Sequence, residues 1–516
     1  MASLACAQDT VSVSMLMETQ SALQTLAAQA TVPPEEEQVM IAFVEAVIVP
    51  GPLEMETIEE DVWEVEPTPE PVTLPTASAS DPGTVRYVTM NGDTINSVAR
   101  RFEVNSVEIS GLDGLNPLYF LPAGRELILP DRVEGTSPPD VLLPDSELIY
   151  SPTASDFDIA AFVNGAGGYL SSYRESTVDG MLSGAEIIAR VASKHSINPR
   201  LLLTLLQYQS DWVYGNNPSN TQRQYPMGYF DTNAVGLEKQ LNWACRQLST
   251  GYYGWRTGRL LFLTFPNGGS IRLSPFLNAG TVGLEYFLAQ TRNVETWYDA
   301  LYGVSSVLEL HSIFFGDFWA RSRQFEPYLD GSLSVPPMEF PFETGRSWNY
   351  TGGPHEAWGE GTPFAALDFA PMGVADCNLT NEWITAMVSG IIVRSEPATV
   401  VVDTDMDGDE QTGWVVFYYH VRSDGRIPTG VTVEQGARIG HPSCEGGTST
   451  GTHVHIARKF NGEWISAGEP GAPWVMSGWM AMNGPTSYQG LLVKNDVIIK
   501  SSRVSSVESS VVIPRN

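Results

Sequence analysis

The sequence has few cysteines, little positive charge and no long apolar run, and each shortage excludes a class of protein. Four cysteines in 516 residues, with no Cys-x-x-Cys pair, argue against a thiolate zinc site. No stretch of 18 or more apolar residues occurs, so we expect no transmembrane helix. Lysine and arginine number 29 against 60 acidic residues, which gives a formal net charge of −31. This charge argues against binding to nucleic acid or to anionic lipid through a basic patch.

The length of 516 residues is too great for one hydrophobic core and predicts two to four domains. Residues 1–84 contain no lysine or arginine and include acidic, proline-rich runs such as Glu64–Pro71. Such segments bury too little apolar surface to offset the entropy of ordering, so we predict a disordered tether. A tether of this kind would hold the later domains away from a membrane or wall.

The segment Ser3-Leu4-Ala5-Cys6 resembles the end of a bacterial lipoprotein signal, in which the cysteine is acylated. The basic and apolar regions that should precede such a motif are missing. Two interpretations stay open. Cys6 is a lipid anchor in a chain whose start is incomplete, or the match is due to chance.

Residues 85–130 have the pattern of a small βααβ unit. The predicted elements are a strand at 87–89, helices at 95–102 and 106–111, and a strand at 126–129. The unit resembles the LysM family in Tyr87-Val88, Gly92-Asp93-Thr94, Ala99-x-x-Phe102, Asn116-Pro117 and Gly124-x-x-Leu127-x-Leu129-Pro130. The resemblance implies binding to N-acetylglucosamine polymers such as peptidoglycan, through the loops after the first strand and before the last. The alternative is a LysM fold that has lost sugar binding.

Residues 131–155 are rich in Pro, Ser and Asp and are predicted as a linker, and helical periodicity follows over 156–330. The predicted helices span 185–195, 199–213, 234–248, 279–289 and 307–315. The run from Ile197 to Ser210 resembles the opening helices of lysozyme-like lytic transglycosylases, whose Glu-Ser pair carries the general acid. Gln209 stands at the glutamate position and cannot donate that proton. We therefore predict a lysozyme-like domain without glycosidase activity, which either positions glycan or serves packing alone.

Residues 331–500 consist of short apolar runs divided by Gly and Pro, which predict an antiparallel β domain followed by a C-terminal tail at 501–516. The predicted strands span 383–393, 399–402, 414–421, 431–439 and 453–460. In the last of these, His453 and His455 lie two positions apart and so face the same side of the strand. Val454 and Ile456 face the opposite side, where an apolar layer can pack.

Three further polar residues of this domain have the chemistry of a metal site. His355 lies on a glycine-rich loop at 351–355, and His420 lies in a predicted strand. Asp368 is a lone carboxylate in the apolar run Phe364–Ala370, a costly position unless it is paired or bound to metal. Two histidines and one carboxylate around Zn²⁺, with one position left to water, form a hydrolytic arrangement.

The region from about 340 to 470 resembles the M23 zinc endopeptidases of the lysostaphin/LytM type. The motifs that carry this resemblance are Tyr418-x-His420, Gly436-x-x-Ile439-Gly440 and Ser449-Thr450-Gly451-Thr452-His453-x-His455. Members of this family cut peptide cross-links in peptidoglycan. Many members have the first His and the Asp four positions apart, whereas thirteen positions separate them here. The longer spacing, with Gly-Gly before the His and Leu-Asp-Phe around the Asp, resembles the β-lytic branch.

The resemblance implies that His355, Asp368 and His455 bind zinc, with Glu356 and Glu360 as weaker alternative ligands. It also implies that His420 and His453 form the catalytic pair. In the expected mechanism, a zinc-bound water attacks the amide carbonyl. One histidine of the pair accepts its proton, and the other stabilises the oxyanion.

A second metal site and a disulfide are weaker expectations for the same domain. Asp403, Asp405, Asp407 and Asp409 alternate along a loop with Gly408 at its sixth place, as in calcium loops. The twelfth place holds Trp414 instead of the usual glutamate, so the alternative is an acidic, solvated hairpin. Cys377 and Cys444 either form a disulfide, which would place the domain outside the cytosol, or are two free thiols.

Together these features predict an exported zinc endopeptidase that acts on peptidoglycan. We expect it outside the cell or in the cell envelope, as a lipoprotein if Cys6 is acylated. The alternative is a non-catalytic protein that binds or regulates the cell wall through the same folds. A third interpretation, a glycan-cleaving enzyme built on residues 156–330, is disfavoured by Gln209.

Overall fold

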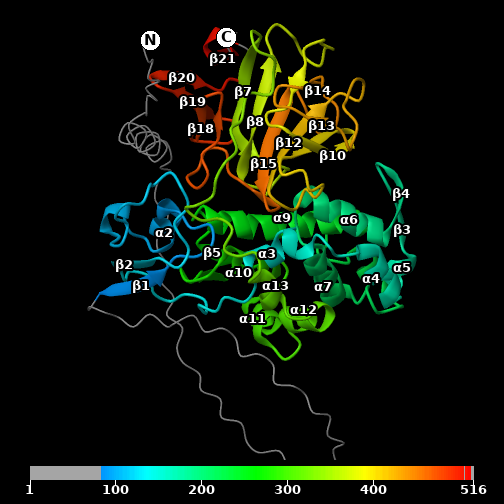
Figure 1. Cartoon of the computed structure of the whole chain (residues 1–516). Coiled ribbons are helices and arrows are strands. Elements are labelled where there is room, and N and C mark those ends of the chain that lie inside the picture. Colours follow the sequence, from blue (N-terminus) through cyan, green and yellow to red (C-terminus); the bar gives the residue numbers. More distant parts are fainter. Residues whose placement is uncertain (1–82, 505, 513–516) are drawn as a thin grey trace, which may run out of the picture.

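The computed structural model describes residues 83–504 and 506–512, so Cys6 and the rest of the predicted tether lie outside the described residues. The chain forms a small αβ unit, a helical layer and a β domain, and the β domain lies along one side of the helical layer (Figure 1). None of the helices in the described part of the chain is both long and apolar enough to cross a bilayer.

The small unit has the βααβ order expected from the sequence. Strand β1 (Thr84–Val88) pairs antiparallel with β2 (Glu126–Pro130), and α2 (Ile95–Arg101) lies between them in the sequence. The second predicted helix is a single 3₁₀ turn at Ser106–Glu108. The Thr94 hydroxyl caps α2 by accepting a hydrogen bond from the Ser97 N–H at 3.1 Å. Assignment of this unit to the LysM family stays a prediction.

The helical layer contains all five helices expected between residues 185 and 315, several of them with shifted ends. Asn198 caps α7 and Pro199 occupies its first turn, as proline readily does. The helices are α3 (Asp145–Leu148), α4 (Ile159–Ala166), α5 (Tyr169–Ser172), α6 (Gly184–His195), α7 (Pro199–Ser210), α8 (Asn220–Gln224), α9 (Leu237–Arg256), α10 (Ala279–Ala289), α11 (Val294–Tyr302), α12 (Val307–Phe315) and α13 (Phe318–Ser322). Two hairpins, β3 (Arg174–Thr177) with β4 (Gly180–Ser183) and β5 (Phe262–Thr264) with β6 (Ser270–Arg272), extend from the layer.

The segment 131–155, predicted as a linker, is largely part of the helical layer. Leu143, Leu148 and Ile149 are completely buried in the same core as the long helices. Asp145 is buried as well, and its carboxylate accepts a hydrogen bond from the Gly280 N–H at the start of α10. A few apolar side chains among prolines and serines are enough to anchor a segment whose composition suggests a spacer.

The β domain is built on a nine-stranded sheet with the order β13-β10-β11-β12-β15-β8-β7-β21, in which β16 also pairs with β15. These strands are β7 (Ser347–Glu356), β8 (Phe364–Pro371), β10 (Gly390–Glu396), β11 (Ala398–Asp403), β12 (Trp414–Val421), β13 (Thr432–Val433), β15 (Val454–Phe460), β16 (Glu463–Trp464) and β21 (Ser510–Val512). Two smaller sheets flank it: β9 (Ile384–Thr385) with β14 (Arg438–Gly440), and β17 (Val475–Met476), β18 (Trp479–Asn483), β19 (Gly490–Lys494) and β20 (Val497–Lys500).

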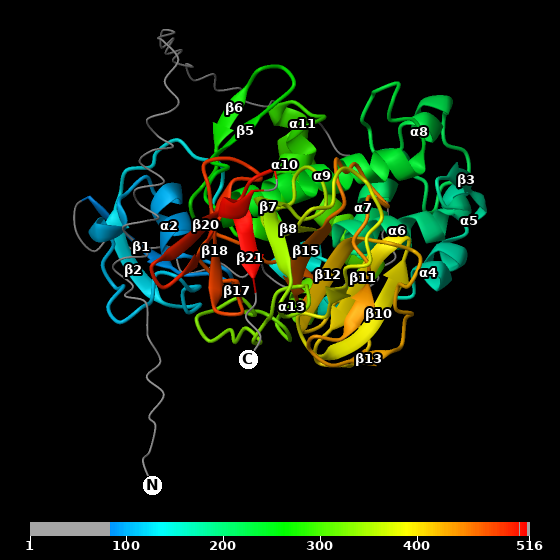
Figure 2. The same ribbon diagram turned by 90° about the horizontal axis from the view of Figure 1, so that it is seen from above.

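The two faces of the central sheet pack against different cores. Val454 and Ile456 of β15 face the interior of the β domain, as the alternation in the sequence predicted. Ala366 of β8, Phe417 of β12 and Ala457 of β15 face the helical layer and join its core. Figure 1 and Figure 2 both show α6 and α9 next to the strands from β8 to β15. The face that carries Asp368 and His455 is therefore the face that packs on the helices.

A disulfide joins Cys377 to Cys444, with the two Cα atoms 5.7 Å apart, so the expected bond forms and the alternative of two free thiols does not. It closes a loop across 67 positions of the β domain, a constraint worth about 4 kcal/mol in the chain-entropy model. Cys245 lies buried in α9 as a free thiol.

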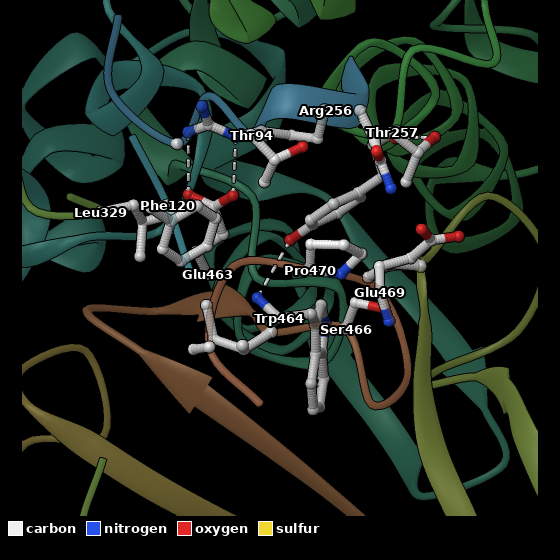
Figure 3. Close-up of a pocket in the computed structure, with 16 residues that line it drawn as sticks. Thr94, Phe120, Arg256, Thr257, Leu329, Glu463, Trp464, Ser466, Glu469 and Pro470 are labelled. Carbon is white, nitrogen blue, oxygen red and sulfur yellow. Dashed lines mark hydrogen bonds and ion pairs between the residues drawn. The ribbon is translucent and has the colours of Figure 1, made fainter. Parts of the chain in front are cut away.

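Arg256, at the end of α9, joins the three parts of the molecule. Its guanidinium lies 2.9 Å from Asp145 and 2.9 Å from Glu463 of β16, and all three groups are buried. The Asn91 side chain of the small unit donates to the Asp145 carboxylate at 3.1 Å. Figure 3 looks into the pocket where these parts meet and shows Arg256 facing Glu463. Buried charges need such pairing, so loss of one partner would loosen the junction.

Glu285 on α10 is a buried acid. Neither of its carboxyl oxygens has a hydrogen-bond partner among the described residues, and the side chain is completely buried. Burial, assisted by the nearby Asp140, raises the pKa of Glu285 well above its usual value. The folded protein therefore keeps a proton on Glu285 that the unfolded chain releases above about pH 4.3.

Replacement of Glu285 by methionine should stabilise the helical layer, and the gain should grow with pH. Folding of the wild type must take up this proton. Its free energy of unfolding therefore falls by up to about 1.4 kcal/mol for each pH unit above about 4.3, until the pH reaches the folded-state pKa of Glu285. We expect the melting temperature of Glu285→Met to exceed that of the wild type by about 5 °C or more at pH 8, and by less at pH 5. The exposed Glu295→Met serves as control. Equal melting temperatures at both pH values would contradict the prediction.

Candidate metal centre

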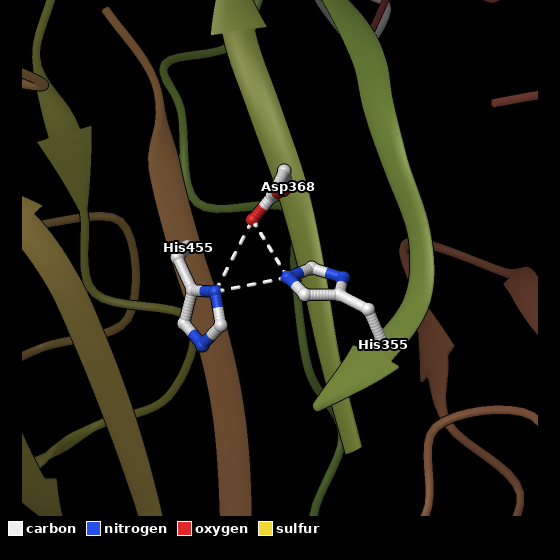
Figure 4. A group of neighbouring side chains, drawn as sticks. All are labelled: His355, Asp368 and His455. Carbon is white, nitrogen blue, oxygen red and sulfur yellow. Dashed lines mark hydrogen bonds and ion pairs between the residues drawn. The ribbon is translucent and has the colours of Figure 1, made fainter. Parts of the chain in front are cut away.

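Three neighbouring strands bring His355, Asp368 and His455 together (Figure 4). Strand β8 lies between β7 and β15, and His455 of β15 is directly opposite Asp368 of β8. His355 was predicted on a loop, but it lies in β7, where irregular pairing between Gly352 and Glu356 turns it toward Asp368. Gly352 is opposite Asp368, and any side chain there would collide with the Asp368 carboxylate.

The three side chains have the dimensions of a tetrahedral metal site. His355 Nε2 lies 3.0 Å from His455 Nδ1, and each nitrogen lies 3.3 Å from Asp368 Oδ1. Three ligands that each lie 2.0–2.1 Å from a tetrahedral zinc ion are separated from one another by roughly 3.3 Å. The triangle therefore matches zinc without rearrangement of the strands.

Hydrogen bonds on the outer side of each ring determine which nitrogen faces the centre. His355 Nδ1 donates to the Gly353 carbonyl at 2.8 Å, and His455 Nε2 donates to the Ala357 carbonyl at 3.0 Å. In the neutral rings, the remaining nitrogens carry lone pairs that point at each other and at Asp368. Carbonyl partners of this kind are what orient metal-ligating histidines.

A cation is needed where these lone pairs meet. Asp368 Oδ1 is buried and accepts no hydrogen bond from the part of the chain that the structure describes. Burial alone would raise the pKa of Asp368, but the imidazoles of His355 and His453 hold it well below its usual value. Burial works against a proton on His355, yet Asp368 outweighs it and raises the pKa of His355. A proton and a metal ion therefore compete for the same place, so metal binding should weaken in acid.

His420 and His453 form a second pair beside the triangle. Their ring centroids are 4.4 Å apart, and His453 Nε2 lies 3.8 Å from Asp368 Oδ1. The Nδ1–H groups of His420 and His453 donate to the carbonyls of Glu445 at 2.8 Å and Gly451 at 2.7 Å. Both Nε2 atoms are therefore left free. Burial, with His453 alongside, lowers the pKa of His420 to about 3, so its ring is neutral near pH 7.

His420 reaches this pair because its strand is irregular. Tyr419 pairs with Thr399 and Val421 pairs with Ala398, which leaves His420 as an extra residue between them. Its φ of 62° lies in the left-handed region, which residues other than glycine adopt at a cost. Strict alternation would turn His420 away from Tyr419 and from the triangle. The bulge redirects the ring toward His453.

Tyr488 belongs to the site, and the sequence did not point to it. Its ring stacks on His355 with the centroids 4.1 Å apart. The residue follows β18, beyond the region that resembles M23 enzymes, and its φ of 67° is again left-handed. The Gly353 N–H donates to the Tyr488 carbonyl at 2.8 Å, and the Tyr488 N–H donates to the Pro354 carbonyl at 3.2 Å. A single tyrosine in a Gly-Pro-Ser-rich turn has no signal that could have identified it.

The alternative zinc ligands lie outside the triangle, and the predicted calcium site gains no support. Glu356 accepts a hydrogen bond from Ser487, and the exposed Glu360 lies 3.8 Å from Arg246, so neither belongs to the triangle. Oxygens of Asp403, Asp405 and Asp407 gather within 4.8 Å, and Asp409 lies outside this group. The buried Asp403 accepts backbone N–H groups of Asp405 and Gly408. Asp409 is missing from the group and Trp414 stands where the closing carboxylate would be, so calcium binding gains no support.

Comparisons with known proteins place this site in a family. A family model described as the LasA N-terminal domain matches residues 141–326. Protease LasA from Pseudomonas aeruginosa is 24% identical over 348 residues, which cover 64% of this chain and 76% of that protein. Beta-lytic metalloendopeptidase from Lysobacter enzymogenes is 30% identical over 137 residues, which cover 25% of this chain and 71% of the relative. The chain belongs to the LasA-like M23 proteases.

Further relatives carry similar names. Beta-lytic metalloendopeptidase from Achromobacter lyticus is 32% identical over 154 residues, which cover 28% of this chain and 38% of that protein. A solved structure entitled "A Novel M23 Metalloprotease Pseudoalterin from Deep-sea" is 26% identical and covers 33% of this chain and 96% of that chain, with a TM-score of 0.28. This LasA-like protease is thus a zinc metalloendopeptidase. Its helical layer corresponds to the LasA N-terminal domain, and the lysozyme-like assignment stays a prediction.

Removal of the Asp368 carboxylate should abolish metal binding while the β domain stays folded. We expect Asp368→Ala to retain less than about a tenth of the zinc measured per wild-type molecule by atomic emission after gel filtration, because one charged ligand and its orientation of His355 are lost. The control Asp407→Ala removes an exposed carboxylate of the acidic loop and should keep its zinc. Full zinc content in Asp368→Ala, with an unchanged circular dichroism spectrum, would disprove this ligand.

Proposed function

We propose that this zinc metalloendopeptidase hydrolyses peptide bonds in the cross-links of bacterial peptidoglycan, outside the cell or in the cell envelope. The observation that carries the proposal is the convergence of His355 Nε2, Asp368 Oδ1 and His455 Nδ1 within 3.3 Å of one another, beside a second histidine pair. Relatives named as metalloendopeptidases support the same conclusion.

His355, Asp368 and His455 hold the zinc ion in this proposal. The carbonyls of Gly353 and Ala357 fix the two ligating rings, and Tyr488 covers the outer face of His355. Zinc in this position supplies a Lewis acid that polarises the scissile carbonyl and lowers the pKa of water. The residues around it exclude solvent from one side and keep the ligands in place during turnover.

His420 and His453 move the proton. Each ring is anchored through Nδ1 to a backbone carbonyl, and each presents Nε2 to the space beside Asp368. Each neutral ring already has a proton on Nδ1, and two imidazolium rings 4.4 Å apart would repel each other, so the pair binds at most one further proton in the resting enzyme. One histidine accepts the proton of the attacking water. The other, with the further proton on its Nε2, donates a hydrogen bond to the oxyanion that develops on the carbonyl.

A non-catalytic wall-binding protein is the competing function. Loss of a metal ligand would favour it, because one missing ligand leaves a buried charge without its cation. All three ligands and both additional histidines are present and converge in one place. This complete set favours the enzyme.

Glycan binding by residues 85–130 and acylation of Cys6 are lesser parts of the proposal. The loop that contains Asn91 and Gly92 is bonded to the backbone of Leu329, and Phe120 is bonded to Gly471. Both loops that the LysM resemblance assigns to the sugar groove thus contact the rest of the chain. These contacts favour a role in holding the three parts together. Cys6 lies outside the described residues, so its acylation stays a prediction.

Mass spectrometry of fragments released from purified peptidoglycan tests the function directly. With zinc present, the wild type should release peptides with new amino termini, and the identity of these termini names the bond that is cut. His420→Ala should keep its zinc and lose about 100-fold or more in turnover, because a positioned proton carrier contributes on that scale.

Replacement of a histidine outside the site supplies the control. His441 donates from Nδ1 to the Glu382 carbonyl and stacks against Trp383, away from the zinc ligands. His441→Gln should cleave like the wild type. Intact peptides in every sample would instead point to the binding function, and full turnover by His420→Ala would remove that histidine from the mechanism.

A further inference from the structure

An arginine from the C-terminal segment extends the stack that begins at the metal centre. His355 covers one side of the Tyr488 ring at 4.1 Å with an interplanar angle of 18°. The Arg503 guanidinium carbon lies over the same ring, 4.7 Å from its centroid. Because the imidazole already covers one face, the guanidinium takes the other. His355, Tyr488 and Arg503 therefore form a column that leads from the metal ligands to the surface.

The charge of Arg503 has no ion-pair partner within the described part of the chain. None of the ion pairs in that part includes Arg503, and its side chain is exposed. Glu356, which acts electrostatically on Tyr488, already accepts a hydrogen bond from Ser487. Contact with the tyrosine ring restricts the motion of the guanidinium and leaves its N–H groups free toward solvent.

The position and charge of Arg503 point to a ligand on the substrate. The two ring distances place the guanidinium roughly 9 Å from the His355 imidazole, about three residues of an extended peptide. A planar guanidinium pairs best with a carboxylate through two parallel hydrogen bonds. The net charge of −31 would not attract an anionic substrate over long distances, so recognition of an anion needs a local cation such as this one.

We propose that Arg503 binds a free carboxylate of the substrate peptide, about three residues of extended chain from the His355 ring, and so selects acid-bearing peptide stems. The inference rests on the proposed function and names the substrate class of that same site. Tyr488 acts as a positioning residue, since its ring holds both His355 and the guanidinium. The carboxylate is either the C-terminus of a peptide stem or an acidic side chain within it.

Steady-state kinetics on two forms of one substrate test this inference. Soluble cross-linked muropeptides are compared with the same material after carbodiimide coupling to methylamine, which converts free carboxylates to neutral amides. For the wild type, we expect kcat/KM to fall about tenfold on amidation, mainly through a higher KM, as for the loss of one charge-assisted pair. Arg503→Gln should show the lower value with both substrates.

Three variants separate carboxylate binding from a structural effect. Arg503→Lys keeps the charge but loses the planar fork, so it should retain part of the preference for the native substrate. Tyr488→Phe should retain most of it, because the ring and not the hydroxyl supports the guanidinium. Lys500→Gln removes an exposed positive charge from the same segment and should leave the preference unchanged.

The possible outcomes are distinct. Equal losses by Arg503→Gln on native and amidated substrate would mean that Arg503 only positions Tyr488, and no loss on either would mean that it plays no part. Both results overturn the inference and leave the endopeptidase intact. If the wild type cleaves neither muropeptide, the proposed function itself fails.

If the wild type prefers the native substrate and Arg503→Gln does not, synthetic peptides with a single carboxylate replaced by carboxamide show whether the C-terminus or a side chain is bound.

Discussion

His355, Asp368 and His455 direct lone pairs at one another in a buried space, and this arrangement requires a cation. Much of the β domain holds these three side chains in place. The carbonyls of Gly353 and Ala357 orient the two imidazoles, and the register of β8 against β15 places Asp368 opposite His455. Each of these features costs free energy when the centre is empty, since a buried carboxylate oxygen is left without a partner. A bound metal ion would offset that cost and would hold the ligands in place.

Backbone strain at two positions completes the site. His420 and Tyr488 both have φ values near 65°, a conformation that is costly for side chains of their size. In each case, surrounding hydrogen bonds hold the strained residue in place. For His420 these are the carbonyl of Glu445 and the bulged pairing of β11 with β12, and for Tyr488 they are the two backbone bonds to Gly353 and Pro354. The strain aims two rings that regular strands would direct elsewhere.

The helical layer and the β domain share a continuous core, so the metal centre lies beside an interface between two parts of the chain. Ala366 and Ala457, each two residues from a member of the proposed metal site, pack against the helices. The Arg256–Glu463 pair holds the same two parts together further along, and Asn91 ties the small unit to that junction. The geometry of the proposed zinc ligands therefore depends on contacts with the helical layer.

The sequence by itself determined the local features of this protein. It was sufficient for the helices of the middle region, for the alternation of His453 and His455 with Val454 and Ile456, and, through resemblance, for the M23 assignment. These features depend on spacing within one strand or helix and are therefore visible in the chain. Only the tertiary structure decided the irregular pairing that redirects His355 and His420, the burial of residues 143–149, and the approach of Tyr488 and Arg503 to the metal centre. Each of these depends on contacts between segments far apart in the sequence, whose free energy no local pattern records.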